Sequence, residues 1–245
     1  VEGLREDQAK DHWNRLPVDY VSFEKCYRGE YQEVKRRFAI YVDFFRGCTK
    51  VLDIGCGRGE FLKLLKENGI GAIGIDADEN MIRICAEMGL DVKHDDALAY
   101  LQSIADNSLD GIFCAHLVEH LRPGDLVELV RLSHAKLRSG SYFIVETPNP
   151  LSVITSTRTF CLDLSHVKPV HPETMRFLLD SNGFGKMKFK FLRTWPEEMR
   201  LTPVKISSKT SHETNRLAEA INQNFQKLNN LLLCEQDYSV IAKKI

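Results

Sequence analysis

Hydrophobic residues along the chain recur in two alternating patterns. Short apolar runs that end in turn residues predict buried strands, and apolar residues at three- and four-residue spacing predict amphipathic helices. Between residues 50 and 146 the two patterns alternate, which predicts an α/β fold with a doubly wound, mostly parallel sheet. The expected strands are 50–54, 72–75, 92–94, 110–115 and 142–146, and the expected helices are 60–68, 79–88 and 124–137.

The two ends of the chain depart from this alternation. Residues 1–49 have helical spacing, and a further helix is expected at 172–182. Lysines alternate with apolar residues over 186–193, which predicts a strand with one solvated face, and 238–243 is its expected hairpin partner. The predicted divisions are an N-terminal helical lid (1–49), an α/β core (50–194), a helical insertion (195–236) and the last strand of the core (237–245).

The insertion contains an expected helix from Asn215 to Leu233 with an apolar stripe. The stripe consists of Leu217, Ile221, Phe225, Leu228 and Leu232. It can pack against the core, close over a site as a lid, or form the contact of a homodimer. The sequence leaves these alternatives open.

Composition narrows the class of protein. Of 245 residues, 43% are hydrophobic and 27% are charged, as in a folded globular chain. We expect no transmembrane helix, and residues 1–10 do not resemble a signal peptide. Seven cysteines without metal-ligand spacing predict reduced thiols and a cytoplasmic location. The chain lacks the concentrated basic footprint of a nucleic-acid binder, because residues 51–150 carry net charge −7 and residues 151–245 carry +5.

A glycine-rich loop is the most distinctive local feature. The first expected strand runs through Asp53 into Gly55, Gly57 and Gly59, and a helix follows. Glycine allows positive φ and close approach of a ligand to the backbone, and the helix N-terminus favours negative charge. The dinucleotide pattern G-x-G-x-x-G would need its third glycine at Glu60. A carboxylate two residues before the first glycine suits the amino group of a methionine moiety instead.

Further aspartates follow the next two strands. Asp76 ends the second strand, where it can accept both hydroxyls of a ribose. Asp95, Asp96 and Ala97 follow the third strand, and a carboxylate there can accept the amino group of adenine. Because ligands of open α/β sheets bind at the carboxyl ends of the strands, we expect these groups to share one site.

The fourth strand leads into His116, Glu119 and His120. The spacing H-x-x-E-H also occurs in zinc peptidases, but a metal helix would then lie where a methyl group has to be delivered. We therefore expect no metal. The [D/N]-P-P-[Y/F] motif of N6-adenine and N4-cytosine methyltransferases is absent here. A purely structural role, in which Glu119 and His120 cap the next helix, stays open.

The order of these motifs resembles the class I S-adenosylmethionine-dependent methyltransferases. The resemblance implies a Rossmann-like sheet of seven strands with an antiparallel last strand. The cofactor-binding residues that it implies are Asp53, Gly55, Gly57 and Gly59 at the methionine end, Asp76 at the ribose, Met81, Asp96 and Ala97 at the adenine, and Cys56, Ala77 and His116 as further contacts. We expect Arg28 to reach the cofactor carboxylate or an anionic acceptor.

Nearly the whole chain resembles the methyltransferase domain of bacterial polysaccharide-modifying enzymes, such as O-antigen chain terminators. The segments that carry the resemblance are 23–30, 57–60, 119–121, 146–150, 164–174 and 228–231 with Tyr238. It implies O-methylation of a sugar or glycan in lipopolysaccharide biosynthesis, with peripheral association with a glycan-assembly complex. The alternatives are a small-molecule O-methyltransferase of the quinone-biosynthesis type and a non-catalytic S-adenosylmethionine-binding protein.

Transfer to a hydroxyl group requires a base near neutral pH, for which neutral histidine is suited. The candidates are His116, His120, His166 and His171. We favour His120, oriented by Glu119, with His166 or His171 on the acceptor side. A histidine beside a proline is often only a hydrogen-bonded loop residue, so the late pair can also be structural.

Overall fold

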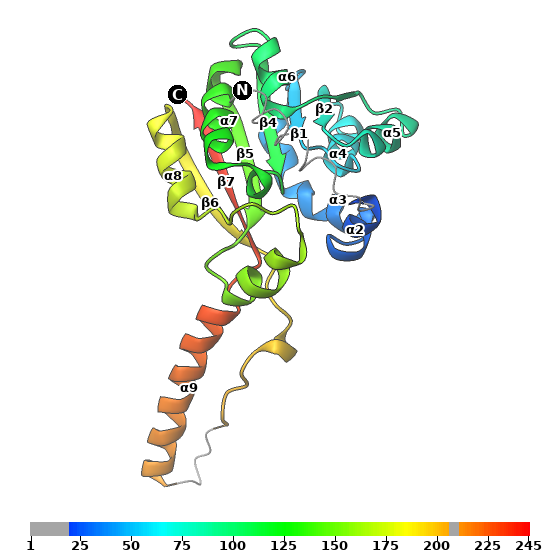
Figure 1. The fold of residues 1–245 in the computed structure, drawn as a ribbon. Helices are drawn as coiled ribbons and strands as arrows, with labels where there is room; N and C mark the ends of the chain where they lie inside the picture. Colours follow the sequence, from blue (N-terminus) through cyan, green and yellow to red (C-terminus); the bar gives the residue numbers. More distant parts are fainter. Residues whose placement is uncertain (1–19, 206–210) are drawn as a thin grey trace, which may run out of the picture.

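The computed structural model describes residues 20–205 and 211–245, which form a twisted sheet flanked by helices (Figure 1). The strands follow the order β3-β2-β1-β4-β5-β7-β6. Strands β1 to β5 pair in parallel, and β7 is antiparallel to both β5 and β6. The predicted seven-stranded, mostly parallel sheet is confirmed. Its strands are β1 (Val51–Ile54), β2 (Ala72–Asp76), β3 (Val92–His94), β4 (Leu109–Ala115), β5 (Leu137–Pro148), β6 (Phe184–Leu192) and β7 (Asp237–Lys244).

Helices precede, connect and follow these strands. The α-helices are α2 (Tyr20–Tyr27), α3 (Tyr31–Phe38), α4 (Glu60–Glu67), α5 (Glu79–Glu87), α6 (Ala97–Ser103), α7 (Pro123–Lys136), α8 (Pro172–Ser181) and α9 (His212–Leu232). Shorter turns are the 3-10 helices η1 (Ala39–Phe45), η2 (Val118–His120), η4 (Phe160–Leu162) and η5 (Glu197–Met199) and the π-helix η3 (Thr155–Thr159). In the part of the chain described, no helix is long and apolar enough to span a membrane.

The two faces of the sheet follow the alternation of side chains along each strand. Val51 of β1 and Phe113 of β4 pack with α3, η1 and α4 on one face. Their neighbours Leu52 and Ile112 pack with α6, α7 and α8 on the other face. Because successive strand residues point to opposite faces, both faces of the central strands are apolar and covered, as in other parallel sheets.

Three local features differ from the sequence expectations. The helix α6 was not predicted, although Asp96 caps it by accepting hydrogen bonds from the backbone N–H groups of Leu98 and Ala99. Within the helical spacing expected for residues 1–49, the stretch 31–45 divides into α3 and η1. Strand β5 begins at Leu137, because that residue continues the pairing with Leu109 before a bulge.

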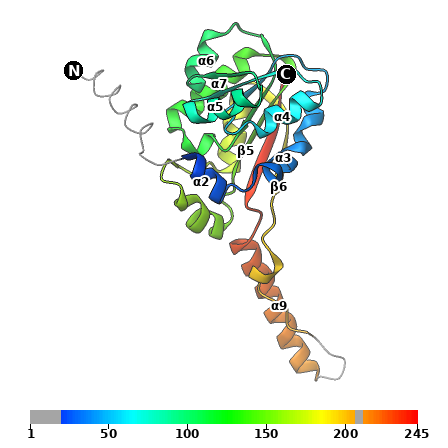
Figure 2. The same ribbon diagram turned by 90° about the vertical axis from the view of Figure 1, so that its right-hand side faces the viewer.

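The insertion forms an arm that leaves the core (Figures 1 and 2). The arm consists of α9 and of the extended segment 200–205, hereafter the strap. The side-chain amide of Asn229 donates to the carbonyl of Leu201 at 3.0 Å and accepts from its N–H at 2.9 Å. Asn222 pairs in the same way with Val204, at 2.9 and 2.7 Å. The two asparagine side chains thus form hydrogen bonds with the backbone N–H and carbonyl groups of the strap, as a neighbouring strand would.

Candidate active site

Two adjoining cavities lie at the edge of the sheet where the parallel strands end. The larger has a volume of about 920 Å³ and the smaller about 120 Å³. Their shared walls include Arg28, which directly follows α2, and His116 and His120, which follow β4. The sheet edge therefore provides a large chamber with a small side chamber, and histidines stand at the junction.

The glycine loop forms one wall of the large cavity through Gly55 and Gly57. Both have positive φ, at 68° and 51°, and Gly59 has a φ of 77°. A Cβ atom on Gly59 would lie 2.6 Å from Cδ1 of Leu90 and 2.8 Å from Sγ of Cys85. Glycine is required at this position for its backbone conformation and for the space behind the loop.

Asp76, at the end of β2, faces the large cavity and holds the glycine loop in place. Its Oδ2 accepts from the N–H of Gly57 at 2.8 Å, and its Oδ1 accepts from the N–H of Asp78 at 2.9 Å. Burial raises the pKa of Asp76, although these two hydrogen bonds favour the charged form and act to lower it. A carboxylate has about four acceptor positions, so two backbone bonds leave capacity for the two hydroxyls of a ribose.

The opposite part of the large cavity follows β2 and β3. It is lined there by Ala77, Met81, Asp96 and Ala97. Met81 is almost fully buried in the first turns of α5, so its thioether forms a fixed apolar wall. Asp96 already caps α6 through Oδ1, and its other oxygen can accept an exocyclic amino group.

Helix α2 contributes a charged cover to both cavities. Arg28 Nη1 donates to Oε1 of Glu24 at 2.7 Å, and the same nitrogen lies 3.2 Å from a Cβ built on Gly57. Arg58 of the glycine loop pairs with Glu60 at 2.7 Å and donates to the carbonyl of Gly29 at 3.0 Å. Arg28 thus lines both cavities, and Arg58 links the glycine loop to α2 through an ion pair with Oε2 of Glu24 at 3.7 Å.

Four predicted site residues lie away from the cavity walls. Asp53 is only 2% exposed behind the loop, and burial raises its pKa well above the usual value. Cys56 packs inward with Cys85, and Gly59 lies at the start of α4. His171 caps α8, where its Nδ1 accepts from the N–H of Glu173 at 3.1 Å. The expectation that His171 lies on the acceptor side is therefore corrected, because this side chain is used by the helix.

His116 lies between two buried carboxylates. Its Nδ1 is 3.3 Å from Oε1 of Glu119, and its Nε2 is 3.5 Å from Oε1 of Glu146. Burial alone would lower the pKa of His116, but the two carboxylates outweigh it and raise the pKa to about 9. At Glu119 burial alone would raise the pKa, but the interaction with His116 outweighs it and lowers the pKa to about 2. At neutral pH His116 is therefore a cation and cannot act as a base.

Contacts from distant parts of the chain hold these carboxylates. The hydroxyl of Tyr41 donates to Glu146, and the hydroxyl of Thr147 donates to Oε2 of Glu119 at 2.9 Å. Asp237, the first residue of β7, lies in the same cluster and pairs with Arg193 at 3.1 Å. The N-terminal helices and the last strand therefore both support the junction of the cavities.

His120 has the opposite electrostatic setting. Burial is the largest influence and lowers its pKa, although Glu119 opposes the shift. Its Nδ1 lies 2.9 Å from Oγ of Ser165, and the Ser165 hydroxyl donates its single proton to Asp163. The Ser165 oxygen can then only accept, so Nδ1 carries the ring proton and Nε2 is the basic nitrogen. His120 is thus neutral at pH 7 and has a fixed tautomer.

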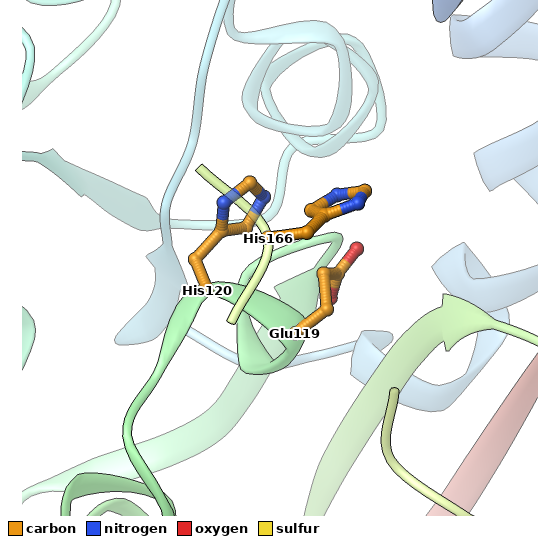
Figure 3. A group of neighbouring side chains, drawn as sticks. All are labelled: Glu119, His120 and His166. Atoms are coloured by element: carbon orange, nitrogen blue, oxygen red, sulfur yellow. The ribbon is translucent and has the colours of Figure 1, made fainter. Parts of the chain in front are cut away.

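His166 stands beside His120 and Glu119 (Figure 3). The two imidazole rings are 4.6 Å apart between centroids, and His166 also stacks on Phe160 at 4.4 Å. Nδ1 of His166 lies 2.7 Å from the carbonyl of Phe160 and donates to it. Glu119 and His166 line the small cavity, as two of the predicted catalytic residues.

Sequence reasoning did not identify Asp163, Ser165, Glu146 or Asp237 as site residues. Glu146 and Ser165 lie in segments that the resemblance quoted, but no spacing rule brings residue 165 to residue 120. Glu24 could have been found, because it is one helical turn before Arg28 and forms an i, i+4 ion pair with it.

The strand order, the glycine loop after β1 and the carboxylate after β2 define a class I methyltransferase fold, with a cavity at the ends of its parallel strands. Comparisons with known proteins agree with this assignment. A crystal structure of a SAM-dependent methyltransferase from Archaeoglobus fulgidus superimposes with a TM-score of 0.86 and 44% identity, over 93% of this chain and 100% of that one. The chain therefore belongs to the S-adenosylmethionine-dependent methyltransferases, and S-adenosylmethionine is its cofactor.

More distant relatives cover only part of the chain. The family model described as "Methionine biosynthesis protein MetW" matches residues 35–150. A probable S-adenosylmethionine-dependent methyltransferase of Mycolicibacterium smegmatis is 29% identical over 61% of this chain and 58% of its own length. The human mitochondrial ubiquinone biosynthesis O-methyltransferase is 27% identical over 56% of this chain and 41% of its own length. The chain thus spans about half the length of the curated relatives that it matches.

We expect Asp76→Ala to weaken the binding of S-adenosylhomocysteine, because the variant loses charge-assisted hydrogen bonds to the ribose. Such bonds contribute roughly 1.5–3 kcal/mol, which corresponds to about tenfold to 150-fold in Kd. Isothermal titration calorimetry measures the change. Asp76→Asn is the matched control, since it retains one oxygen for the loop and should lose less. Equal affinity of wild type and Asp76→Ala would contradict the assignment.

The ion pairs of His116 predict a pH dependence of stability. Its folded pKa of about 9 exceeds the ordinary value of 6.5, so the stabilisation is complete below pH 6.5 and is lost as pH rises toward 9. Each pKa unit corresponds to about 1.4 kcal/mol. Urea denaturation between pH 6.5 and 9 should show a decline in the wild type that is largely absent from His116→Asn. Asparagine tolerates the positive φ of 54° at this position. Parallel declines in the two proteins would show that His116 does not carry the effect.

Proposed function

We propose that this methyltransferase transfers the methyl group to a hydroxyl oxygen of a sugar, at the end of a glycan. The observation that carries the proposal is His120, which is neutral, has its tautomer fixed, and stands where the two cavities meet. A sugar hydroxyl stays protonated at neutral pH, so its proton must leave during transfer. A neutral histidine at this junction is suited to receive it.

When bound, S-adenosylmethionine supplies a methyl group on a positively charged sulfur, which retains the electron pair of the broken carbon–sulfur bond. In this proposal the larger cavity binds the cofactor: Asp76 binds the ribose, Asp96 and Ala97 bind the adenine, and Arg28 binds the carboxylate. Nε2 of His120 takes the proton of the acceptor hydroxyl as its oxygen gains the methyl group. Ser165 and Asp163 act as positioning residues, because they orient His120 and keep Nδ1 protonated.

The small cavity supports a sugar as the acceptor. At about 120 Å³ it has room for roughly four water molecules at ~30 Å³ each, which is enough for the reacting hydroxyl of a sugar and its neighbouring groups. Its walls carry carboxylates such as Asp163 and Asp237, the guanidinium of Arg193 and the ring of Phe160. Carboxylates and guanidinium groups can pair with neighbouring hydroxyls, and an aromatic ring can cover the apolar face of a sugar.

A small-molecule acceptor of the quinone-biosynthesis type is the second candidate. One observation favours it: Leu162 and Leu164, which line the large cavity, are 48% and 72% exposed at its rim. Apolar side chains there could contact an isoprenoid tail, and one relative acts in ubiquinone biosynthesis. The same leucines would also suit the lipid carrier of a glycan and peripheral association with a glycan-assembly complex. The polar walls of the small cavity favour the sugar.

The acceptor can be identified by mass spectrometry after incubation with cofactor that carries a labelled methyl group. We expect one added methyl on lipid-linked glycans and little transfer to polyprenylated phenols. Transfer to the phenol alone would replace the sugar proposal by the quinone type. The cytoplasmic location belongs to the same proposal and agrees with the seven free cysteines.

We expect His120→Ala to lower kcat by roughly 10² or more while S-adenosylhomocysteine affinity changes less than about threefold, because the base acts in the transition state. Ser165→Ala should lower kcat by less than His120→Ala does, because His120 remains but loses the hydrogen bond that orients its ring. His212→Ala, an exposed histidine on the arm, is the control. The kcat of the wild type should rise with pH, with a midpoint below 6.5, since burial lowers the pKa of His120. Normal turnover of His120→Ala would refute the role.

We also expect turnover to survive a chelator. Two triplets place potential ligand atoms within 4.8 Å, Glu119 with His120 and His166, and His116 with Glu146 and Asp237. The side chains in both triplets have protein partners, and a neutral His120 suffices as a base. Activity measured in excess EDTA should equal that without it. Loss of activity with EDTA, and recovery with Mg²⁺ or Zn²⁺, would show that one triplet binds a metal.

A further inference from the structure

The arm carries a partly exposed apolar stripe on the side of α9 next to the face that binds the strap. Seen along the helix, Ala218, Asn222, Phe225 and Asn229 form the inner face, where both asparagines bind the strap. The outer stripe lies beside this inner face, because its residues come one position before those of the inner face. It consists of Leu217, Ile221, Asn224, Leu228 and Leu231. Leu217, Leu228 and Leu231 are 63%, 43% and 56% exposed.

The outer stripe has the spacing of a coiled-coil seam. Its members are separated by four, three, four and three residues, which is the heptad pattern that keeps one seam facing a partner helix. The charged residues of α9 after Glu213 are Arg216, Glu219 and Lys227, and none belongs to the stripe. No part of the core covers it, because α9 extends away from the sheet in both views (Figures 1 and 2).

The stripe is complementary to a second copy of itself. Leu217 and Leu231 each lie seven residues from Asn224. If two α9 helices pack antiparallel about Asn224, each Leu217 therefore meets the partner's Leu231, and the asparagines face one another. Ile221 and Leu228 occupy nearly equivalent positions, three residues before and four residues after the centre. A two-fold interface requires this self-complementary arrangement, and a buried polar residue at one seam position fixes the register.

We propose that α9 mediates an antiparallel homodimer with Asn224 at its two-fold axis. The helix has 21 residues, so it is about 31 Å long and about 10 Å wide. It presents roughly 300 Å² per copy, less than the ~800 Å² of a standard interface. The dimer is therefore weaker than one with a standard interface. It pairs two catalytic cores without using their cavities, since no residue of α9 lines either cavity.

Analytical ultracentrifugation of the full chain from 1 to 200 µM tests the dimer. We expect the wild type to pass from monomer to dimer in this range, and Leu228→Glu to raise the dissociation constant at least tenfold. Gln226→Glu adds the same charge on the opposite side of α9 and should dimerise as the wild type does. Both variants should retain the helical circular dichroism and cofactor affinity of the wild type, which shows that they fold.

Cysteine cross-linking tests the orientation, in a background with Cys26 and Cys161, the two exposed cysteines, replaced by serine. A mixture of Leu217→Cys and Leu231→Cys proteins should form a disulfide-linked dimer, and neither protein alone should. Cross-linking of Leu217→Cys with itself would instead indicate parallel helices. That result would overturn the proposal. So would a wild type that stays monomeric at every concentration, or a Leu228→Glu variant that dimerises as the wild type does. Binding of the arm to phosphatidylglycerol vesicles, if Leu228→Glu abolishes it, would also overturn the proposal.

Discussion

A cationic histidine held between two buried carboxylates organises the catalytic edge of this protein. His116 receives Glu119 on one ring nitrogen and Glu146 on the other, and its backbone N–H donates to the carbonyl of Glu146 at 2.8 Å. Its positive φ turns the chain sharply after β4. Because Tyr41 donates to Glu146, the N-terminal helices are attached to the same centre. Burying a charge is favourable only when partners compensate it, so these segments are mutually dependent.

The two histidines after β4 show how environment divides roles between chemically identical groups. His116 lies among carboxylates and stays protonated, whereas His120, four residues later, is desolvated and bonded to a hydroxyl. One side chain therefore serves as a fixed positive charge, and the other is a neutral imidazole. Pairs of groups whose environments separate their pKa values in this way mark acid–base sites in many enzymes.

Much of the sheet and of the lining of the large cavity could be predicted, because both depend on local pattern. Strand ends are visible in the sequence, and parallel strands bring Asp76 and Asp96 to one edge whatever the rest of the chain does. The partners of His120 could not be predicted, since Ser165 reaches it only through tertiary packing. His171 was misplaced although its sequence offered the signal: proline and glutamate directly after it are typical of a helix N-terminus.

The pairing between α9 and the strap restricts how the arm can change during evolution. Asn222 and Asn229 are seven helical residues apart, which is about 10.5 Å at 1.5 Å per residue. Leu201 and Val204 are three extended residues apart, which is about 10 Å at 3.3 Å per residue. Between the two pairs the helix and the strap therefore have to change together, for example by about seven residues in the helix and three in the strap. A change in one alone would put the asparagines out of register.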